Sequence, residues 1–165
     1  MNTGLTPRKT TFPMTGQGKT NKHRRRRNLR VLITGGAGFI GSNFTNLLLK
    51  SKAGYRVTVF DAMTYASNPK TMRSFARFKN FRFIKGDIRN PGQIAAAVKN
   101  ADIVVNFAAE THVDRSILEP GIFADTNVKG VVNLLDAAKK YGIKKFIQIS
   151  TDEVYGSVAK GKSKE

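Results

Sequence analysis

The sequence predicts an α/β fold in which a single parallel sheet carries helices on both faces. Five runs rich in Val, Ile and Phe alternate with segments of helical periodicity. The run at residues 101–109 is apolar almost throughout, which is typical of a parallel strand covered on both faces. A glycine-rich stretch joins the first run to the first helical segment, as a tight strand-to-helix turn would. Right-handed crossovers between such elements give a doubly wound sheet with strand order 3-2-1-4-5.

Each element can be placed along the chain. Strands are expected at residues 29–33, 56–60, 81–84, 101–109 (with the exit of the strand included) and 145–150. Helices are expected at residues 39–52, 93–99 and 121–141. A polar loop follows the second strand, and a short basic segment leads from it to Lys79. Gly54 and Gly142 follow the first and last of these helices, where glycine commonly stops a helix.

The net charge of +18 is concentrated in the first third of the 165-residue chain. Residues 1–60 contain no Asp or Glu, and the densest basic run is at residues 22–27. Residues 1–28 have no apolar periodicity, so we expect a disordered basic arm there. Residues 29–157 amount to one domain, and residues 158–165 are expected to form a loose tail.

The basic arm has three interpretations. An organellar transit peptide is Arg-rich, hydroxyl-rich and poor in acids, but this arm lacks clear amphipathic periodicity. A nucleic-acid-binding or nuclear-localising tail fits the Arg run, since attraction to phosphate is largely independent of sequence. The third interpretation is a solvated extension without a function.

Composition excludes several classes of site. The chain has no cysteine, so disulfides and thiolate metal ligands are excluded, and no metal site is expected. No stretch approaches the roughly 18 consecutive apolar residues of a membrane-spanning helix. We therefore expect a cytoplasmic protein that does not contact a membrane.

The glycine-rich stretch after the first strand has the spacing of two dinucleotide-binding motifs. Gly36, Gly38 and Gly41 form G-x-G-x-x-G, and Gly35 begins the related G-x-x-G-x-x-G. Such a turn exposes backbone N–H groups at a helix N-terminus, where a phosphate is favoured. Asp61 follows at the end of the second strand, where a carboxylate can bind ribose hydroxyls. The sequence thus predicts a dinucleotide site in which Asp61 selects NAD over NADP.

Polar residues also follow the third, fourth and fifth strands, at the edge where open α/β sheets bind ligands. Asp87 can accept a bond from an adenine, or it can serve as a plain turn or helix cap. Residues 110–116 are dense in polar side chains and are expected to be functional. Asp152 and Glu153 are adjacent carboxyls that would repel when both ionise, which suits a general acid and a general base. The alternative is a helix cap formed by Asp152 or by Thr151 before it.

Five blocks of the sequence occur in the order and spacing of one enzyme family. They are residues 35–41, 61–66, 86–88, 108–116 and 150–156. Over residues 29–157 the chain resembles the extended short-chain dehydrogenase/reductases with their Rossmann-type domain, and most closely the branch that dehydrates dTDP-glucose. The adjacent carboxyls favour this branch, because related sugar-nucleotide epimerases usually carry small or hydroxyl residues there.

The resemblance implies an NAD-dependent dehydration of a nucleotide sugar: oxidation at C4, loss of water across C5 and C6, and return of hydride to C6. It implies that Asp152 protonates the departing hydroxyl and that Glu153 takes the C5 proton, while Thr111 and Thr151 contact the sugar. Residues that resemble supports of this pocket are His112, Asp114 and Arg115. Positions that match cofactor contacts are Gly35, Gly38, Phe39, Ile40, Gly41, Asp61, Ala62, Met63, Thr64, Asp87, Ile88, Phe107, Ala108, Ala109, Glu110, Thr111 and Thr126.

One part of the family pattern is not found. The oxidation step needs a Tyr-x-x-x-Lys pair on the helix after the fifth strand, whereas Tyr155 and Lys160 are five residues apart. We therefore expect an N-terminal portion, truncated before the later strands and the substrate domain, that binds NAD with little or no turnover. The helix at residues 121–141 resembles a dimer-forming helix, which implies a homodimer.

Three alternatives to a dehydratase stay open. One is an NAD-dependent sugar-nucleotide epimerase, and another is a non-catalytic NAD-binding module. The last is a nucleic-acid binder that acts through the basic arm. It ranks lowest, because no folded segment interleaves aromatic and basic residues as stacking platforms do.

Overall fold

The computed structural model, which describes residues 28–156 and Gly161, confirms the predicted α/β architecture. Its five parallel strands form one sheet in the predicted order, β3-β2-β1-β4-β5. The strands are β1 (Arg30–Thr34), β2 (Arg56–Asp61), β3 (Phe81–Lys85), β4 (Ile103–Asn106) and β5 (Lys145–Gln148). Apart from Asn28 and Gly161, the expected arm at residues 1–28 and tail at residues 158–165 lie outside the described residues.

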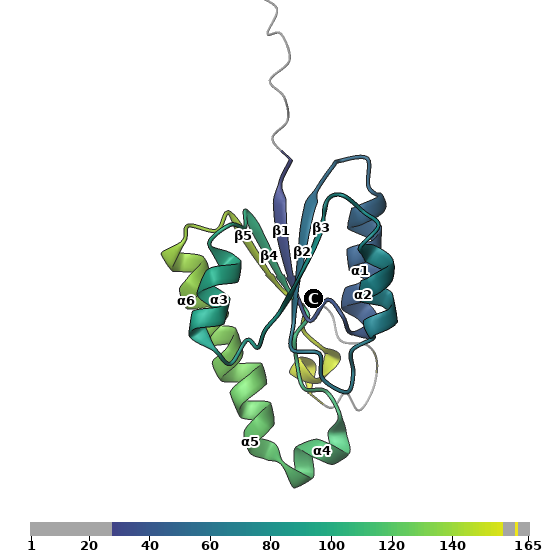
Figure 1. Cartoon of the computed structure of the whole chain (residues 1–165). Helices are drawn as coiled ribbons and strands as arrows, with labels where there is room; N and C mark the ends of the chain where they lie inside the picture. Colours follow the sequence, from purple (N-terminus) through teal and green to yellow (C-terminus); the bar gives the residue numbers. More distant parts are fainter. Residues whose placement is uncertain (1–27, 157–160, 162–165) are drawn as a thin grey trace, which may run out of the picture.

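Helices cover both faces of the sheet (Figure 1). They are α1 (Phe39–Lys50), α2 (Pro69–Phe75), α3 (Pro91–Val98), α4 (Val113–Leu118), α5 (Pro120–Phe123), the π-helix η1 (Ala124–Gly130), α6 (Val131–Lys140) and the 3₁₀-helix η2 (Asp152–Tyr155). Helices α1 and α2 lie on one side of the sheet and α3 and α6 on the other. In the part of the chain that the structure describes, no helix is long and apolar enough to cross a membrane.

Helices α2 and α3 both begin with an Asn-Pro pair. Asn68 Oδ1 accepts hydrogen bonds from two backbone N–H groups of the first turn of α2, at 3.0 and 3.3 Å. Asn90 Oδ1 accepts one from the first turn of α3, at 3.1 Å. Proline fits the first helical position because the N–H there has no intrahelical partner. The predicted start at residue 93 is therefore wrong, since α3 begins at Pro91, and the segment predicted only as basic contains α2.

The helix expected at residues 121–141 is a succession of α5, η1 and α6. Gly130 closes the π-helix against the loop after β3, where a Cβ on it would lie 2.7 Å from Ile88 Cδ1. The predicted stop at Gly142 is confirmed, with φ of +63°. Part of the polar stretch at residues 110–116 belongs to α4, which its composition did not indicate because polar residues give no apolar periodicity.

Alternating side chains of β1 contribute to two cores, one on each face of the sheet. Val31 and Ile33 pack with residues of α1 and α2, whereas Leu32 packs with residues of α3 and α6. Thr34, the last residue of β1, is fully buried. The carboxyl end of β1 is therefore a fixed point from which the glycine-rich turn emerges.

Candidate functional site

The carboxyl ends of the strands surround a cleft that gathers most of the predicted cofactor residues. Those that line it are Gly35, Gly38, Asp61, Ala62, Thr64, Asp87, Ile88, Phe107, Ala108, Ala109, Glu110 and Thr126. Those that do not are Phe39, Ile40, Gly41, Met63 and Thr111. The cleft has a volume of about 100 Å³. Because ligand pockets commonly measure about 300–1,000 Å³, a larger ligand would extend from it along the open edge of the sheet.

The fold excludes a side chain at three positions of the glycine turn: Gly36, where a Cβ would lie 2.8 Å from both γ-carbons of the buried Val59, and two positions where it would meet backbone. Gly35 has φ of +68°, and a Cβ on it would lie 2.5 Å from the backbone nitrogen of Ala108. A Cβ on Gly41 would overlap the carbonyl oxygen of Gly35. Gly38 differs, because its Cβ would have that same oxygen as its nearest neighbour, at 3.4 Å, and the residue lines the cleft. Gly35 and Gly41 are thus required by the fold, whereas Gly38 leaves space for a ligand.

Helix α1 starts beside the cleft without a capping side chain. Gly38 occupies the N-cap position, and no acidic residue lies in the first turn. Phe39 and Ile40 of the first turn are not packed into the core, since the two residues are 84% and 63% exposed. Unpaired N–H groups and the helix dipole make such an end favourable for an anion.

Asp61 holds the glycine turn as well as the loop after β2. It is only 6% exposed, and its Oδ2 accepts a hydrogen bond from the backbone N–H of Ala37 at 2.9 Å. Its Oδ1 accepts from Met63 N and from Ser67 Oγ, both at 2.8 Å. Met63 has φ of +58°, and the bond to Asp61 fixes this left-handed conformation. Since a carboxylate offers about four acceptor positions, Oδ2 keeps one for a further donor such as a hydroxyl.

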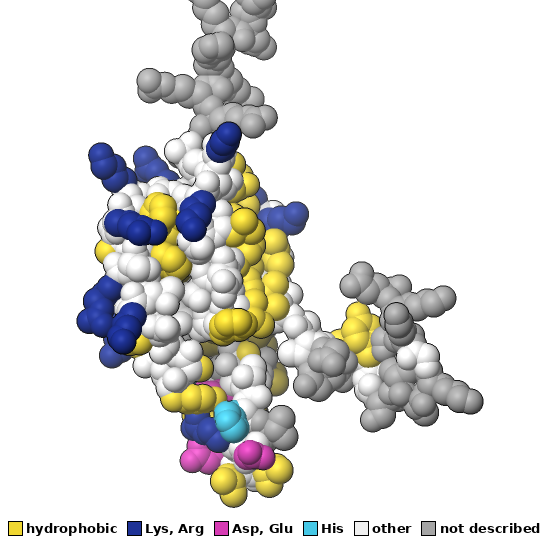
Figure 2. Space-filling view, turned by 90° about the vertical axis from the view of Figure 1, so that its right-hand side faces the viewer, with side chains coloured by type: hydrophobic (Ala, Val, Ile, Leu, Met, Phe, Trp, Pro, Cys, Tyr) yellow, Lys and Arg dark blue, Asp and Glu magenta, His cyan; other side chains and the backbone are white. Residues whose placement is uncertain are grey.

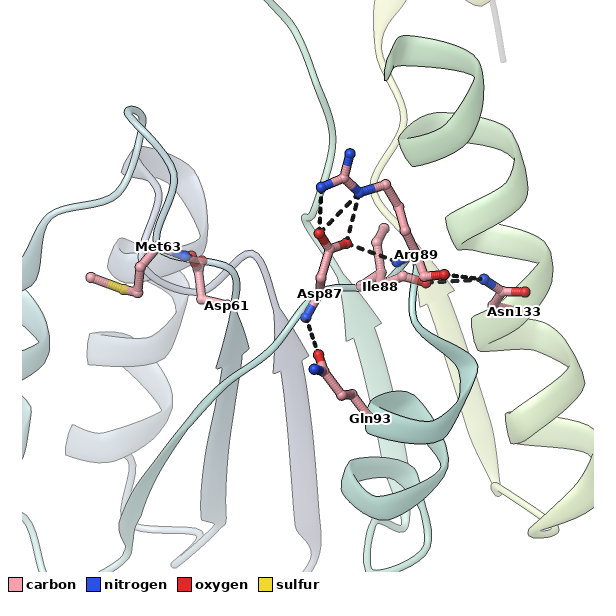
Figure 3. A network of polar contacts seen from close by, with 7 residues as sticks. All are labelled: Asp61, Met63, Asp87, Ile88, Arg89, Gln93 and Asn133. Carbon is pink, nitrogen blue, oxygen red and sulfur yellow. Dashed lines mark hydrogen bonds and ion pairs between the residues drawn. The ribbon is translucent and has the colours of Figure 1, made fainter. Parts of the chain in front are cut away.

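Asp87 is paired with Arg89 in the loop after β3 (Figure 3). Nη2 and Nε of the guanidinium donate to Oδ2, at 2.6 and 2.9 Å, and Nε also donates to Oδ1 at 3.0 Å. This hydrogen bonding lowers the pKa of Asp87 from its ordinary value. Asn133 of α6 and Gln93 of α3 bind backbone groups of the same loop. Of the two structural alternatives for Asp87, the turn agrees with the structure, because Asp87 accepts from Arg89 N, whereas the cap of α3 is Asn90.

A buried polar network, which sequence reasoning missed, joins the ends of three strands. Thr34 Oγ1 donates to Asn106 Oδ1, and both residues are fully buried. Asn106 Nδ2 donates to Gln148 Oε1 at 2.9 Å, and Asn106 Oδ1 also accepts from Ala108 N at 3.1 Å. The network therefore fixes the exit of β4, which lines the cleft, relative to β1 and β5. The feature of the sequence that could have indicated this network is a single Asn, Asn106, at the end of an apolar run.

Asn127 of η1 is a second residue that sequence reasoning missed. Its Oδ1 accepts from Glu110 N and its Nδ2 donates to Glu110 O, both at 2.8 Å. The amide thus satisfies both backbone groups of one residue of the cleft wall. Thr126, its neighbour in η1, lines the cleft. The π-helix is the element that brings both side chains to this wall, in line with the frequent occurrence of π-turns at functional sites.

Side chains of the loop after β2 contact side chains that follow β4. Tyr65 Oη donates to Glu110 Oε2 at 3.2 Å. The guanidinium carbon of Arg115 lies 4.8 Å from the centroid of the Tyr65 ring, and Arg115 Nη1 is 3.7 Å from Glu110 Oε2. His112 faces the same ring edge-on at 6.4 Å. These contacts connect two loops that line the cleft, so Arg115 and His112 support its shape.

The predicted catalytic pair lies after β5, at the same edge of the sheet. The backbone of residues 152–155 forms η2, which follows the exposed Thr151 directly. The side chains of Asp152 and Glu153 lie outside what the structure describes. Thr111 is exposed and precedes α4. Among the side chains that the structure describes, no group of three or more His, Cys, Asp or Glu could hold a metal ion.

A Tyr-x-x-x-Lys spacing does occur once in the sequence, at Tyr141 and Lys145, which was not among the predicted site residues. Tyr141 follows α6 and Lys145 begins β5, so the pair lies at the amino ends of the strands. The cleft lies at the carboxyl ends. This pair therefore cannot reach a ligand in the cleft, and its spacing is not evidence for catalysis.

The strand order, the glycine turn and the cleft at the carboxyl ends define a Rossmann-type domain of the extended short-chain dehydrogenase/reductases. The cleft lies beside β1, where the strand order reverses, which is where such sheets bind ligands. The chain belongs to the GDP-mannose 4,6-dehydratase family, whose profile matches residues 32–165.

Similar proteins include dehydratases and epimerases of nucleotide sugars. The low-salt glycan biosynthesis protein Agl12 of Haloferax volcanii is 50% identical over 135 residues, which cover 82% of this chain and 43% of that protein. The crystal structure of DesIV, a dTDP-glucose 4,6-dehydratase from Streptomyces venezuelae with NAD bound, is 44% identical, with a TM-score of 0.74 over 81% of this chain and 42% of that one. A UDP-Glc/GlcNAc 4-epimerase from Campylobacter jejuni is 28% identical, with a TM-score of 0.72 over 78% and 39%. The chain thus spans about two fifths of the length of these relatives.

Proposed function

We propose that this chain binds NAD in the cleft at the carboxyl ends of its strands. The observation that carries the proposal is Gly38, where a Cβ would have space in the fold and where the uncapped start of α1 faces the cleft. The diphosphate would bind at this helix end, because backbone N–H groups and the helix dipole favour an anion there. Asp61 would accept a ribose hydroxyl with the acceptor position left on Oδ2. A 2′-phosphate would meet the same carboxylate, which disfavours NADP.

Thermal unfolding with and without nucleotide tests the NAD proposal. NAD at about 100 times its Kd should stabilise the chain by about 2.7 kcal/mol, and NADP should do so much less. In Asp61→Ala the increment from NAD should shrink, since a hydrogen bond to a charged group contributes about 1.5–3 kcal/mol. Each increment is measured against the same variant without nucleotide, because Asp61 also holds Ala37.

Asp136→Ala is the matched control for the NAD test. Asp136 is an exposed carboxylate of α6 and does not line the cleft. Its removal changes the net charge as Asp61→Ala does, and the increment from NAD should stay unchanged. Equal stabilisation by NADP and NAD would contradict the role given to Asp61.

For the reaction itself, we propose dehydration of a nucleotide-diphosphate sugar, with dTDP-glucose as the substrate. NAD, when bound, would supply reversible hydride transfer with C4 and then C6 of the sugar. Asp152 would give a proton to the departing C6 hydroxyl and Glu153 would take the C5 proton, while Thr111 and Thr151 hold the sugar. The support is the adjacent carboxyl pair after β5 and the similarity to dTDP-glucose 4,6-dehydratases such as DesIV.

The alternative is a sugar-nucleotide epimerase, a class to which the Campylobacter jejuni relative belongs. Incubation with NAD and dTDP-glucose distinguishes the two, because a dehydratase forms a 4-keto-6-deoxy product and an epimerase forms the 4-epimer. We propose that these 165 residues alone bind NAD with little or no turnover, since Tyr155 and Lys160 do not have the family spacing. Robust turnover by the chain would refute this part, and NAD binding without any turnover would leave a non-catalytic binding module.

We further propose that the protein forms a homodimer through α5, η1 and α6. Val128, Val132 and Leu135 are exposed on this helical segment at spacings that place them on one face. Light scattering of the purified chain should give the mass of a dimer, and Val132→Lys should shift it toward the monomer. A monomer at all concentrations would contradict the proposal. The cytoplasmic location remains a prediction from sequence.

A further inference from the structure

A contact between the loops after β2 and β4 spans the cleft at the carboxyl edge of the sheet. Tyr65 follows β2 and Glu110 follows β4, whereas β1 lies between these two strands. The hydrogen bond from Tyr65 Oη to Glu110 Oε2, at 3.2 Å, therefore passes across the turn that follows β1. This is the turn that leads to the uncapped start of α1, where the diphosphate is proposed to bind.

The backbone on each side of this contact is held in place. In the loop after β2, Asp61 Oδ1 accepts hydrogen bonds from one residue before and one residue after Tyr65, both at 2.8 Å. In the loop after β4, Asn127 binds both backbone groups of Glu110, also at 2.8 Å. Rotation of the Tyr65 side chain thus opens the contact without movement of either backbone.

Tyr65 is the exposed partner in this contact. It is 57% exposed, whereas the side chain of Glu110 is 10% exposed. The guanidinium carbon of Arg115 lies 4.8 Å from the centroid of the Tyr65 ring, which adds a cation–π contact. Figure 2 shows basic, histidine and acidic side chains close together at the end of the molecule away from the start of the described chain. We call the side chains of Tyr65, Glu110 and Arg115 the latch.

We propose that the latch slows both the entry and the release of the dinucleotide. The proposal rests on the NAD site proposed above. Because the cleft measures about 100 Å³, a dinucleotide would extend past Glu110 along the open edge and beneath the latch. Tyr65 does not line the cleft, so it is a positioning residue that acts through Glu110.

The latch is built only from residues of this chain, and none of its contacts needs an atom of the nucleotide. It therefore closes to the same extent whether or not nucleotide is bound. A hydrogen bond and an exposed cation–π contact together favour the closed state by about tenfold. Entry and release then slow by the same factor, and Kd hardly changes, which distinguishes a latch from a residue that contacts the nucleotide.

Stopped-flow fluorescence of NADH with the full chain tests the proposal. Mixing gives the association rate constant, and a chase with excess NAD gives the release rate constant. In Tyr65→Ala both rate constants should rise about tenfold, while Kd changes by less than about twofold. Tyr65→Phe keeps the ring beside Arg115 but loses the hydrogen bond, so both rate constants should rise about threefold. The double variant Tyr65→Ala and Arg115→Gln should be no faster than Tyr65→Ala, since the two residues belong to one latch.

Tyr141→Phe and Leu118→Ala are the matched controls. Tyr141→Phe removes the same hydroxyl from a tyrosine at the opposite edge, whose ring also lies beside a cation, Lys140. Leu118→Ala removes a side chain of α4 that is 81% exposed and does not line the cleft. Both controls should keep the parent's rate constants, and circular dichroism checks that every variant is folded.

The outcomes separate the latch from the NAD site. Unchanged rate constants in Tyr65→Ala would overturn the latch and leave the NAD site intact. A rise in the release rate constant alone, with Kd weakened in proportion, would also overturn the latch, because Tyr65 would then contact the nucleotide directly. If the parent chain did not bind NADH, both the NAD site and the latch would be overturned.

Discussion

The two edges of the sheet differ in charge and in shape, although both are built from connections of the same parallel fold. At the carboxyl edge, Asp61, Asp87 and Glu110 line a cleft beside an uncapped helix end. At the amino edge, the connections carry Lys and Arg, and Asp102 is the carboxylate that the structure describes among them. The first edge therefore offers hydrogen-bond acceptors, whereas the second offers cations.

The difference shows how a parallel topology sorts side chains that are scattered in sequence. Every strand-to-helix connection lies at one edge and every helix-to-strand connection at the other, because all strands run in the same direction. Acidic and basic residues therefore separate in space without forming a run in the sequence. The charge of each edge is the sum of contributions from several short connections.

The largest expected effect concerns the glycine turn at the carboxyl edge. Gly41→Ala should destabilise the chain by about 3 kcal/mol or more, because its Cβ would overlap the backbone of Gly35 where little can shift. Gly38→Ala should cost about 1 kcal/mol or less in stability and still abolish stabilisation by NAD, since the Cβ would occupy the ligand's space. Urea unfolding and thermal shifts with NAD measure both effects. Unchanged NAD binding in Gly38→Ala would mean that the cleft is not the cofactor site.

The sequence predicted the strand order and most of the cleft wall, because both depend on local patterns. The β-branched runs and the glycine spacing are contiguous, so they identify β1, the turn and Asp61. The start of α3 was missed by two residues, since an Asn-Pro cap outweighs apolar periodicity there. The helix α4 was missed for lack of such periodicity.

Long-range polar contacts could not be predicted. Thr34 and Asn106 are 72 residues apart, and Asn106 and Gln148 are 42 apart, so no local spacing relates them. The same holds for the amide of Asn127 that binds the backbone of Glu110. Such residues belong to no recognisable sequence motif, and they act by fixing the position of a cleft wall. Their hydrogen-bond partners can be identified only from the folded structure.

At the amino edge, Asp102→Asn should lower stability by about 1–3 kcal/mol at pH 7, because Asp102 is 8% exposed and accepts charge-assisted bonds. Its donors are the backbone N–H and guanidinium of Arg30, at 3.0 Å, and Lys144 Nζ, at 3.2 Å. Hydrogen bonds from Arg30 hold the pKa of Asp102 well below its ordinary value. A carboxyl with a lowered folded pKa adds stability above its unfolded pKa of about 3.9 and loses it as pH falls toward the folded value.

Urea unfolding of the parent and of Asp102→Asn between pH 7 and about pH 2 checks this dependence. The difference in unfolding free energy should be constant from about pH 5 to pH 7 and should shrink below about pH 4. A difference that grows on acidification would show that the sign is wrong. Because the carboxylate is buried beneath its donors, about 0.5 M NaCl should reduce the effect only slightly.

Asp87→Asn at the carboxyl edge should cause the smallest loss in the free energy of unfolding. This small loss would distinguish the carboxyl edge from the amino edge. Its pKa is also lowered, by Arg89, but the side chains of the pair are 30% and 41% exposed. An exposed ion pair contributes about 0–1 kcal/mol, and about 0.5 M NaCl should remove most of it. The backbone N–H of Asp87 keeps its bond to Gln93, so the loop retains its position in the variant. The prediction is wrong if Asp87→Asn lowers the free energy of unfolding as much as Asp102→Asn does and if added salt does not reduce this loss. That result would mean that the Asp87–Arg89 pair is held as firmly as Asp102 and its donors. The pair would then not be free to adjust to a ligand.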